Sequence, residues 1–135
     1  MSKENKVAGQ MSLDKATRFM DNAKKELALA KKHGYFYEDT KHVSGACGVA
    51  YKGVLVAIDA IFILRGIERE KGKRPTIKFY KSNLAKIDKK MSNSLNTVYK
   101  ILHIEGYYEE FDNVKVISVG FEEAENILKK LKQML

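Results

Sequence analysis

Two segments of the chain combine histidine, tyrosine and carboxylate side chains, which are residue types that serve in acid–base catalysis and in ligand binding. The segments are residues 33–39 (HGYFYED) and residues 103–112 (HIEGYYEEFD), and each begins with a histidine. Each continues through a glycine, then tyrosines, then acidic residues. Each segment ends one long helical pattern and precedes another. The repetition therefore predicts two helical hairpins of similar design.

The side chains that could line a ligand pocket come from these segments and from the start of the helical pattern that follows the first one. They are His33, Tyr35, Tyr37, His42, His103, Tyr107 and Tyr108. No two histidines lie four residues apart and no Glu-x-x-His occurs, so the spacing predicts no metal site. There is also no nucleophile–base pair and no phosphate-binding glycine loop. We therefore expect no catalytic residue, no cofactor and no enzymatic activity.

The elements that must position these residues are helices. Ser12 is a suitable N-cap, and Gly34 a suitable C-terminal stop, for a helix whose apolar residues recur at steps of three and four. That stripe consists of Leu13, Ala16, Met20, Ala23, Leu27 and Ala30. Residues 1–11 are polar and predict a disordered leader, with no signal peptide. Residues 12–135 are then one domain.

Three more helices follow from the same periodicity. One begins at Asp39 or Thr40 and continues to about residue 64, and a break at residues 72–75 contains the only proline. The next spans about residues 76–105, and the last begins after Asp112 with apolar residues at heptad spacing. Short connections make consecutive helices antiparallel. The sequence predicts an all-α protein, an up-down-up-down four-helix bundle made of two similar helical hairpins.

This topology gathers the two histidine–tyrosine segments at one end of the bundle. Two interpretations of that end remain open: a ligand pocket, or helix caps with an aromatic plug that closes the core. The opposite end is basic and offers candidate nucleic-acid-binding residues Arg65, Arg69, Lys73, Arg74 and Lys78. The alternative there is an ordinary solvated face.

The second predicted helix is apolar on nearly every side over residues 54–64. A helix in a four-helix bundle normally keeps one face exposed, so the extra apolar face predicts a homodimer interface at Leu55, Asp59 and Phe62. Because Asp59 is a lone carboxylate in this run, we expect it to pair with a lysine, an arginine or a tyrosine hydroxyl.

Composition limits the cellular setting. The chain has 135 residues, a formal charge of +8 and a single cysteine, Cys47. One cysteine cannot form an internal disulfide, which suits a reducing compartment. The apolar run at residues 54–64 is too short to span a bilayer. These features predict a cytoplasmic protein with no membrane partner and with only weak attraction to polyanions.

Residues 46–60 (ACGVAYKGVLVAIDA), following residues 34–39 (GYFYED), resemble the HEPN superfamily of helical bundles, and the likeness covers roughly residues 12–70. The resemblance implies four or five helices, frequent homodimers and a small bacterial protein. Many members are ribonucleases of toxin–antitoxin systems or partners of nucleotidyltransferases. The ribonucleases carry an arginine followed by four to six residues and then a histidine, and no histidine of this chain is preceded by such an arginine. The resemblance therefore implies a member without that active site.

These observations predict a non-enzymatic HEPN-like interaction or ligand-binding module that forms a homodimer and has a possible protein partner. The alternative is a protein associated with nucleic acid or nucleotides, of the toxin–antitoxin or nucleotidyltransferase-partner type. This alternative protein would bind nucleic acid or nucleotides through the basic end of the bundle.

Overall fold

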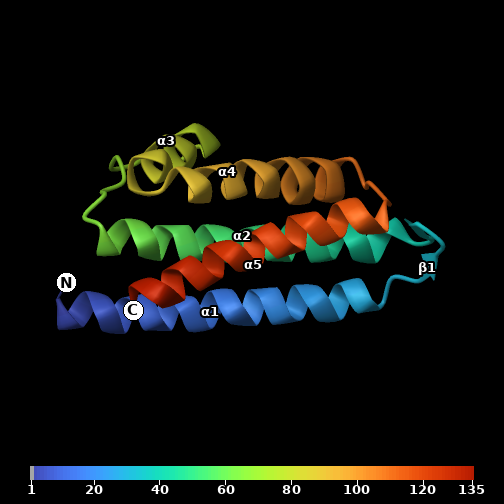
Figure 1. Cartoon of the computed structure of the whole chain (residues 1–135), viewed down its shortest axis with the longest axis horizontal. Coiled ribbons are helices and arrows are strands. Elements are labelled where there is room, and N and C mark those ends of the chain that lie inside the picture. Colours follow the sequence, from blue (N-terminus) through green and yellow to red (C-terminus); the bar gives the residue numbers. More distant parts are fainter. Residues whose placement is uncertain (1) are drawn as a thin grey trace.

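The computed structural model describes residues 2–135, which are predominantly helical (Figure 1). The predicted all-α class is therefore confirmed in broad terms, with one addition, a sheet of two very short antiparallel strands. The elements in chain order are α1 (Lys3–Ala28), β1 (Lys32–His33), β2 (Phe36–Tyr37), α2 (Thr40–Leu64), α3 (Ile77–Ile87), α4 (Lys89–Val98), the π-helix η1 (Tyr99–Tyr108) and α5 (Val114–Met134).

The first helix begins ten residues earlier than predicted. The Ser2 hydroxyl accepts a hydrogen bond from the Asn5 backbone N–H at 3.0 Å, so the cap is Ser2 and not Ser12. Gly9 is buried, and a Cβ there would lie 2.8 Å from the Leu135 side chain. Residues 3–11 of the predicted disordered leader are therefore helical, and Gly9 packs closely against the Leu135 side chain. Met1 lies outside the described residues.

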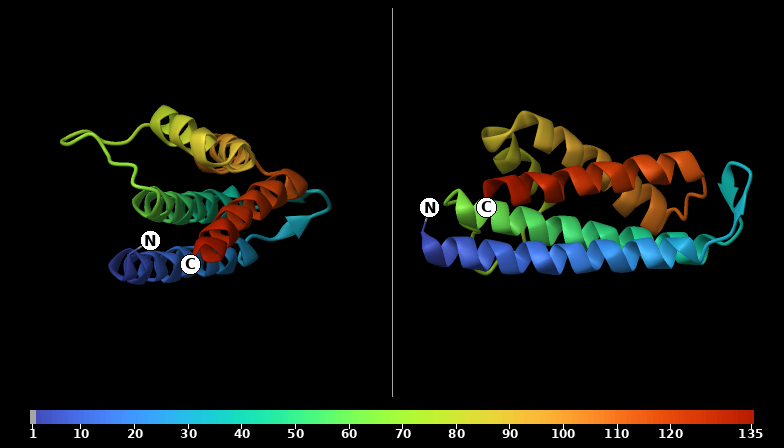
Figure 2. Two further views of the ribbon diagram at one scale, coloured as in Figure 1. Left: turned by 60° about the vertical axis from the view of Figure 1, so that its left-hand side comes forward. Right: turned by 60° about the horizontal axis from the view of Figure 1, so that its bottom comes forward.

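The predicted third helix is instead three consecutive segments. Asp88 has an extended backbone with φ −158°, which ends α3, and its side chain accepts a hydrogen bond from the Lys90 N–H at 2.9 Å, which caps α4. η1 then continues directly from α4. The chain therefore contains more helices than the four predicted, with α3 lying beside α4 (Figure 2).

Helix α2 occupies the centre of the molecule and contacts α1, η1 and α5. It is long and apolar enough to cross a membrane by length and composition, yet 56% of its most apolar window is buried inside the protein. The side chains of Val54, Ala57, Ile58 and Ile61 are inaccessible to solvent. Burial within the chain accounts for this composition, which is weak evidence for a membrane span.

The second apolar face of α2 is covered from within the chain. Phe62 is 3% exposed, and its ring lies edge-on to Phe79 at 5.6 Å and stacks on Tyr80 at 5.9 Å. The prediction that Phe62 belongs to a dimer interface is therefore wrong, because α3 contacts it instead. Leu55 is half-buried against the same core.

Candidate functional site

The two histidine–tyrosine segments meet at one end of the molecule, as the antiparallel arrangement predicted. The Tyr37 backbone N–H donates to the Asp112 carbonyl at 2.8 Å, and the Val114 N–H donates to the Tyr35 carbonyl at 2.9 Å. An isolated β-bridge joins Phe36 to Asn113 between them. The α1–α2 and η1–α5 connectors therefore form one hydrogen-bonded unit, which lies at the end opposite both termini (Figure 1).

The candidate ligand residues of the first segment do not converge on a pocket. His33 and Tyr35 are exposed, whereas Tyr37 is buried, and desolvation raises the pKa of its phenol. The Nδ1 atom of His42 lies 2.9 Å from a Glu26 carboxylate oxygen, which ties α2 to α1. These side chains therefore have separate structural roles.

Exposed aromatic rings dominate the surface of this end. We call the set the aromatic platform; it comprises Tyr35, Phe36, Tyr107, Tyr108 and Phe111. Their exposed fractions lie between 39% and 81%. The expectation of an aromatic plug is therefore correct for Tyr37, which is buried, and wrong for the connector residues Tyr35, Phe36 and Phe111, which are exposed. Tyr107 and Tyr108, at the end of η1, are exposed on one side and contact His103 on the other.

The second segment builds a different arrangement, a ring cluster around His103. The His103 imidazole stacks on Tyr51 of α2 at 4.5 Å, and lies 5.2 Å from the Tyr99 ring and 5.0 Å from the Tyr108 ring. The Tyr107 ring is nearly parallel to it at 6.3 Å. Because a π-helix bonds residue i to i+5, rings four or five residues apart along η1 come to one face. We call these five residues the tyrosine–histidine cluster.

Two glycines allow η1 to approach α2 closely. A Cβ at Gly106 would lie 2.5 Å from the Cys47 sulfur, and a Cβ at Gly48 would lie 2.9 Å from the Tyr107 ring. The Ser44 hydroxyl then donates to the Tyr107 carbonyl at 2.9 Å. The small residues of α2 therefore position η1, and Cys47 is fully buried with a pKa raised to about 12 by desolvation.

The His103 imidazole and the Tyr51 phenol at the centre of the tyrosine–histidine cluster are neutral near pH 7. Desolvation lowers the pKa of His103 and raises the pKa of Tyr51 to about 12. The Lys81 ammonium lies 5.2 Å above the Tyr99 ring at the edge of the cluster. Such a set can stack on a planar group and exchange hydrogen bonds with it. Over residues 2–135, no group of three or more His, Cys, Asp and Glu side chains could hold a metal ion.

Asp59 lies near the other end and has two partners. It accepts a hydrogen bond from the Tyr80 hydroxyl at 2.9 Å and forms an ion pair with Arg69. The prediction that Asp59 pairs with a cation or a tyrosine hydroxyl is confirmed twice, and both partners belong to the same chain. Desolvation, together with the Asp59 charge, raises the pKa of Tyr80.

Three of the five predicted nucleic-acid-binding residues share one cavity of about 270 Å³. Arg69, Lys73 and Arg74 line it beside Phe79 of α3. Lys73 also pairs with Glu70 at 3.1 Å. Arg65 and Lys78 are exposed but are not among the lining residues.

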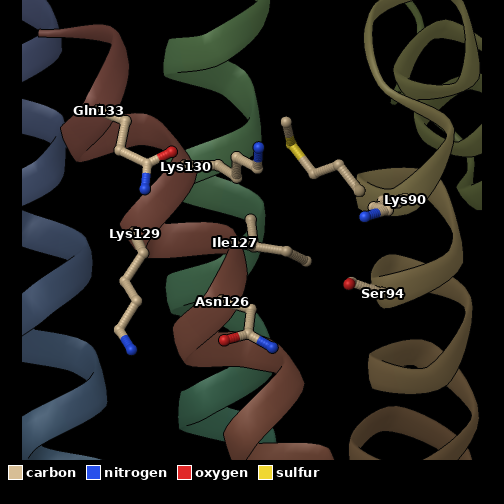
Figure 3. A pocket seen from close by; sticks show the side chains of 8 residues that line it. Lys90, Ser94, Asn126, Ile127, Lys129, Lys130 and Gln133 are labelled. Atoms are coloured by element: carbon tan, nitrogen blue, oxygen red, sulfur yellow. The ribbon is translucent and has the colours of Figure 1, made fainter.

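Sequence reasoning missed a basic pocket between α4 and α5 (Figure 3). Its signal was present, since Lys-Lys pairs begin at residues 89 and 129 without acidic residues in the following turn. The sequence alone does not show, however, that α4 and α5 are neighbours and so bring the two lysine pairs to one pocket.

A solved structure and a family model each match nearly the whole length of this chain. A solved structure of a protein of unknown function from Dyadobacter fermentans is similar, with a TM-score of 0.85 and 35% sequence identity, covering 94% of this chain and 98% of that chain. A search of curated proteins finds no match. The family model described as "Domain of unknown function (DUF5618)" matches residues 11–133. Because that match covers nearly the whole length, the chain belongs to the DUF5618 family.

Proposed function

We propose that this protein is a non-enzymatic, HEPN-like interaction module of the four-helix-bundle type, acting as a homodimer in the bacterial cytoplasm. The observation that carries the proposal is the aromatic platform on two hydrogen-bonded connectors. Large exposed aromatic side chains gathered at one end of a molecule are typical of interaction sites. Aromatic residues are also enriched in the centres of protein–protein interfaces.

A second copy of the chain is the partner that the charges around the platform favour. The connectors and adjoining helix ends carry both signs: Glu38 follows Lys31 and Lys32 in the first connector, and Glu109 and Glu110 lie in the second. A two-fold interface brings each patch against its own copy, so a surface with both signs is able to complement itself. This interface replaces the predicted one at Leu55, Asp59 and Phe62, in which Phe62 is buried by α3.

Light scattering and sedimentation at micromolar concentration test the proposal. We expect a dimer for the natural protein and a monomer for the Tyr35→Ala/Phe36→Ala/Tyr108→Ala variant, whose lost rings are exposed. The matched control is Val7→Ala/Met11→Ala/Ile63→Ala, which removes exposed apolar side chains elsewhere and should remain dimeric. A natural protein that stays monomeric, or a control that dissociates equally, contradicts the proposal.

The basic cavity favours a second candidate function, binding of single-stranded nucleic acid. Arg and Lys side chains neutralise phosphates, and an aromatic neighbour such as Phe79 can stack on a base. Fluorescence anisotropy with a labelled RNA should show affinity that falls steeply as salt rises. Binding that is weak at low salt, or insensitive to salt, excludes this function.

The variant for that test must spare Arg69, because Arg69 holds Asp59. We expect Lys73→Ala/Arg74→Ala/Lys78→Ala to weaken RNA binding and to flatten its salt dependence. The control Lys3→Ala/Lys15→Ala/Lys25→Ala removes the same charge from exposed positions on α1. Equal loss in the two variants would indicate attraction by net charge alone.

A further inference from the structure

We propose that the pocket between α4 and α5 binds a phosphorylated small molecule. Its volume is about 250 Å³, and its lining residues are Lys90, Met91, Ser94, Asn126, Ile127, Lys129, Lys130 and Gln133. Figure 3 shows Lys90 on α4 and Lys130 on α5 facing the same space, with Ser94 one helical turn beyond Lys90. The aromatic platform contributes no residue to the lining of this pocket, so the proposal is independent of the proposed homodimer.

The positive charge of the pocket is the first observation that supports binding of a phosphorylated molecule. Residues 89–98 and 126–135, which form its two walls, contain five lysines and no aspartate or glutamate. Three of those lysines line the cavity itself. Like charges held on facing helices repel one another, and an anion placed between them removes that repulsion.

The frame of the pocket is fixed by a residue outside its lining. Asp88 caps α4 through the N–H groups of Lys90 and Met91, and its other carboxylate oxygen lies 3.4 Å from the Lys130 ammonium. Desolvation acts to raise the pKa of Asp88, but these hydrogen bonds and Lys130 lower it below its ordinary value. Asp88 therefore stays charged and links the two walls, while Lys90 on α4 supplies a further ammonium group to the pocket. The Lys129 side chain extends toward α1 instead.

The remaining lining residues indicate the type of ligand. Ser94, Asn126 and Gln133 supply hydroxyl and carboxamide groups, and Met91 and Ile127 form a floor that is 4% and 0% exposed. An apolar floor with a few polar groups is typical of small-molecule sites, and this volume is below the range for drug-sized ligands. A phosphate on a small body matches this combination, because phosphate accepts several charge-assisted hydrogen bonds at once.

Titration calorimetry at physiological salt, with AMP, inorganic pyrophosphate and adenosine as probes, tests the proposal. We expect saturable one-to-one binding of AMP or pyrophosphate and none of adenosine, which carries the same base and sugar without phosphate. Equal binding of adenosine, or no saturable binding of either phosphorylated probe, overturns the proposal. In a bound sample, the amide NMR signals of Ser94 and Asn126 should shift.

Two variants locate the site. Lys90→Gln/Lys130→Gln should raise the dissociation constant at least about tenfold, since each charged hydrogen bond contributes about 1.5–3 kcal/mol. The control Lys86→Gln/Lys132→Gln removes the same charge from exposed lysines outside the lining. It should change the dissociation constant less than about threefold. Asn126→Leu keeps every lysine but removes a lining amide, and should also weaken binding. Equal losses in the two lysine variants would show non-specific attraction, and would overturn the proposal.

Discussion

The Tyr80 hydroxyl donates a hydrogen bond to the Asp59 carboxylate at 2.9 Å, which joins α3 to the central helix α2. The same carboxylate forms an ion pair with Arg69 in the α2–α3 linker. A carboxylate within the apolar half of α2 therefore organises the segment that follows that helix. This pairing also holds α3 against Phe62, which is 3% exposed.

The first prediction concerns this hydrogen bond. Tyr80→Phe keeps the ring that stacks on Phe62 but leaves Asp59 with one partner fewer. We expect the free energy of unfolding in urea to fall by about 1–2 kcal/mol. The control Tyr108→Phe removes the hydroxyl of an exposed tyrosine and should change the free energy of unfolding by less than about 0.5 kcal/mol. Equal stability of the two variants would show that the Tyr80–Asp59 contact contributes nothing.

The second prediction concerns alkaline pH and Cys47. The pKa of the Cys47 thiol is about 12 in the folded protein and 9.0 in its ordinary environment. Between these values the unfolded chain has lost a proton that the folded chain keeps, so stability falls as pH rises. The limiting slope is about 1.4 kcal/mol per pH unit for one proton.

Urea titrations between pH 8 and pH 10 measure this slope. Cys47→Ala should be less stable at pH 8, since Cys47 is fully buried, yet its stability should change less between pH 8 and pH 10. Above pH 10 both proteins should lose stability, because the pKa of Tyr51 is also raised to about 12. Identical slopes for both proteins below pH 10 would rule out Cys47 as the cause.

The third prediction concerns the close contact between η1 and α2. Gly106→Ala places a Cβ 2.5 Å from the Cys47 sulfur and 3.1 Å from the Ile101 carbonyl, and should cost about 1–3 kcal/mol of stability. In the Cys47→Ala background the same change should cost less, because the sulfur is gone. The control Gly45→Ala has 3.4 Å to its nearest neighbour and should stabilise α2 by about 0.5–1 kcal/mol. Strict additivity of the Gly106 and Cys47 changes would contradict the contact.

The fourth prediction concerns the two connectors. The Tyr37 and Val114 amides are bonded to carbonyls of the opposite connector, at 2.8 and 2.9 Å. Hydrogen exchange followed by NMR should show both amides exchanging more slowly than the amide of exposed Gly72 in the α2–α3 linker. Exchange at the same intrinsic rate in all three positions would mean that the connectors separate readily in solution.

Local sequence was enough to predict the helical class, the course of α2 and the meeting of the two connectors. Apolar spacing identifies a helix face, and short connections require antiparallel neighbours, so both follow from nearby residues. The kind of partner that Asp59 has could also be predicted, because a lone carboxylate in an apolar run needs a hydrogen-bond donor or a cation.

The tertiary structure alone decided the remaining features. The apolar spacing of residues 76–105 predicts one α-helix and does not distinguish the π-helix η1, whose close contact with α2 at Gly106 and Cys47 joins residues far apart in the sequence. The burial of Phe62 depends on Phe79 and Tyr80 of α3, and Gly9 near the start of α1 packs against Leu135 at the other end of the sequence. The α4–α5 pocket likewise joins lysines about forty residues apart. Residue spacing determined which helices form and how they alternate, whereas contacts between distant residues determined which side chains remain exposed.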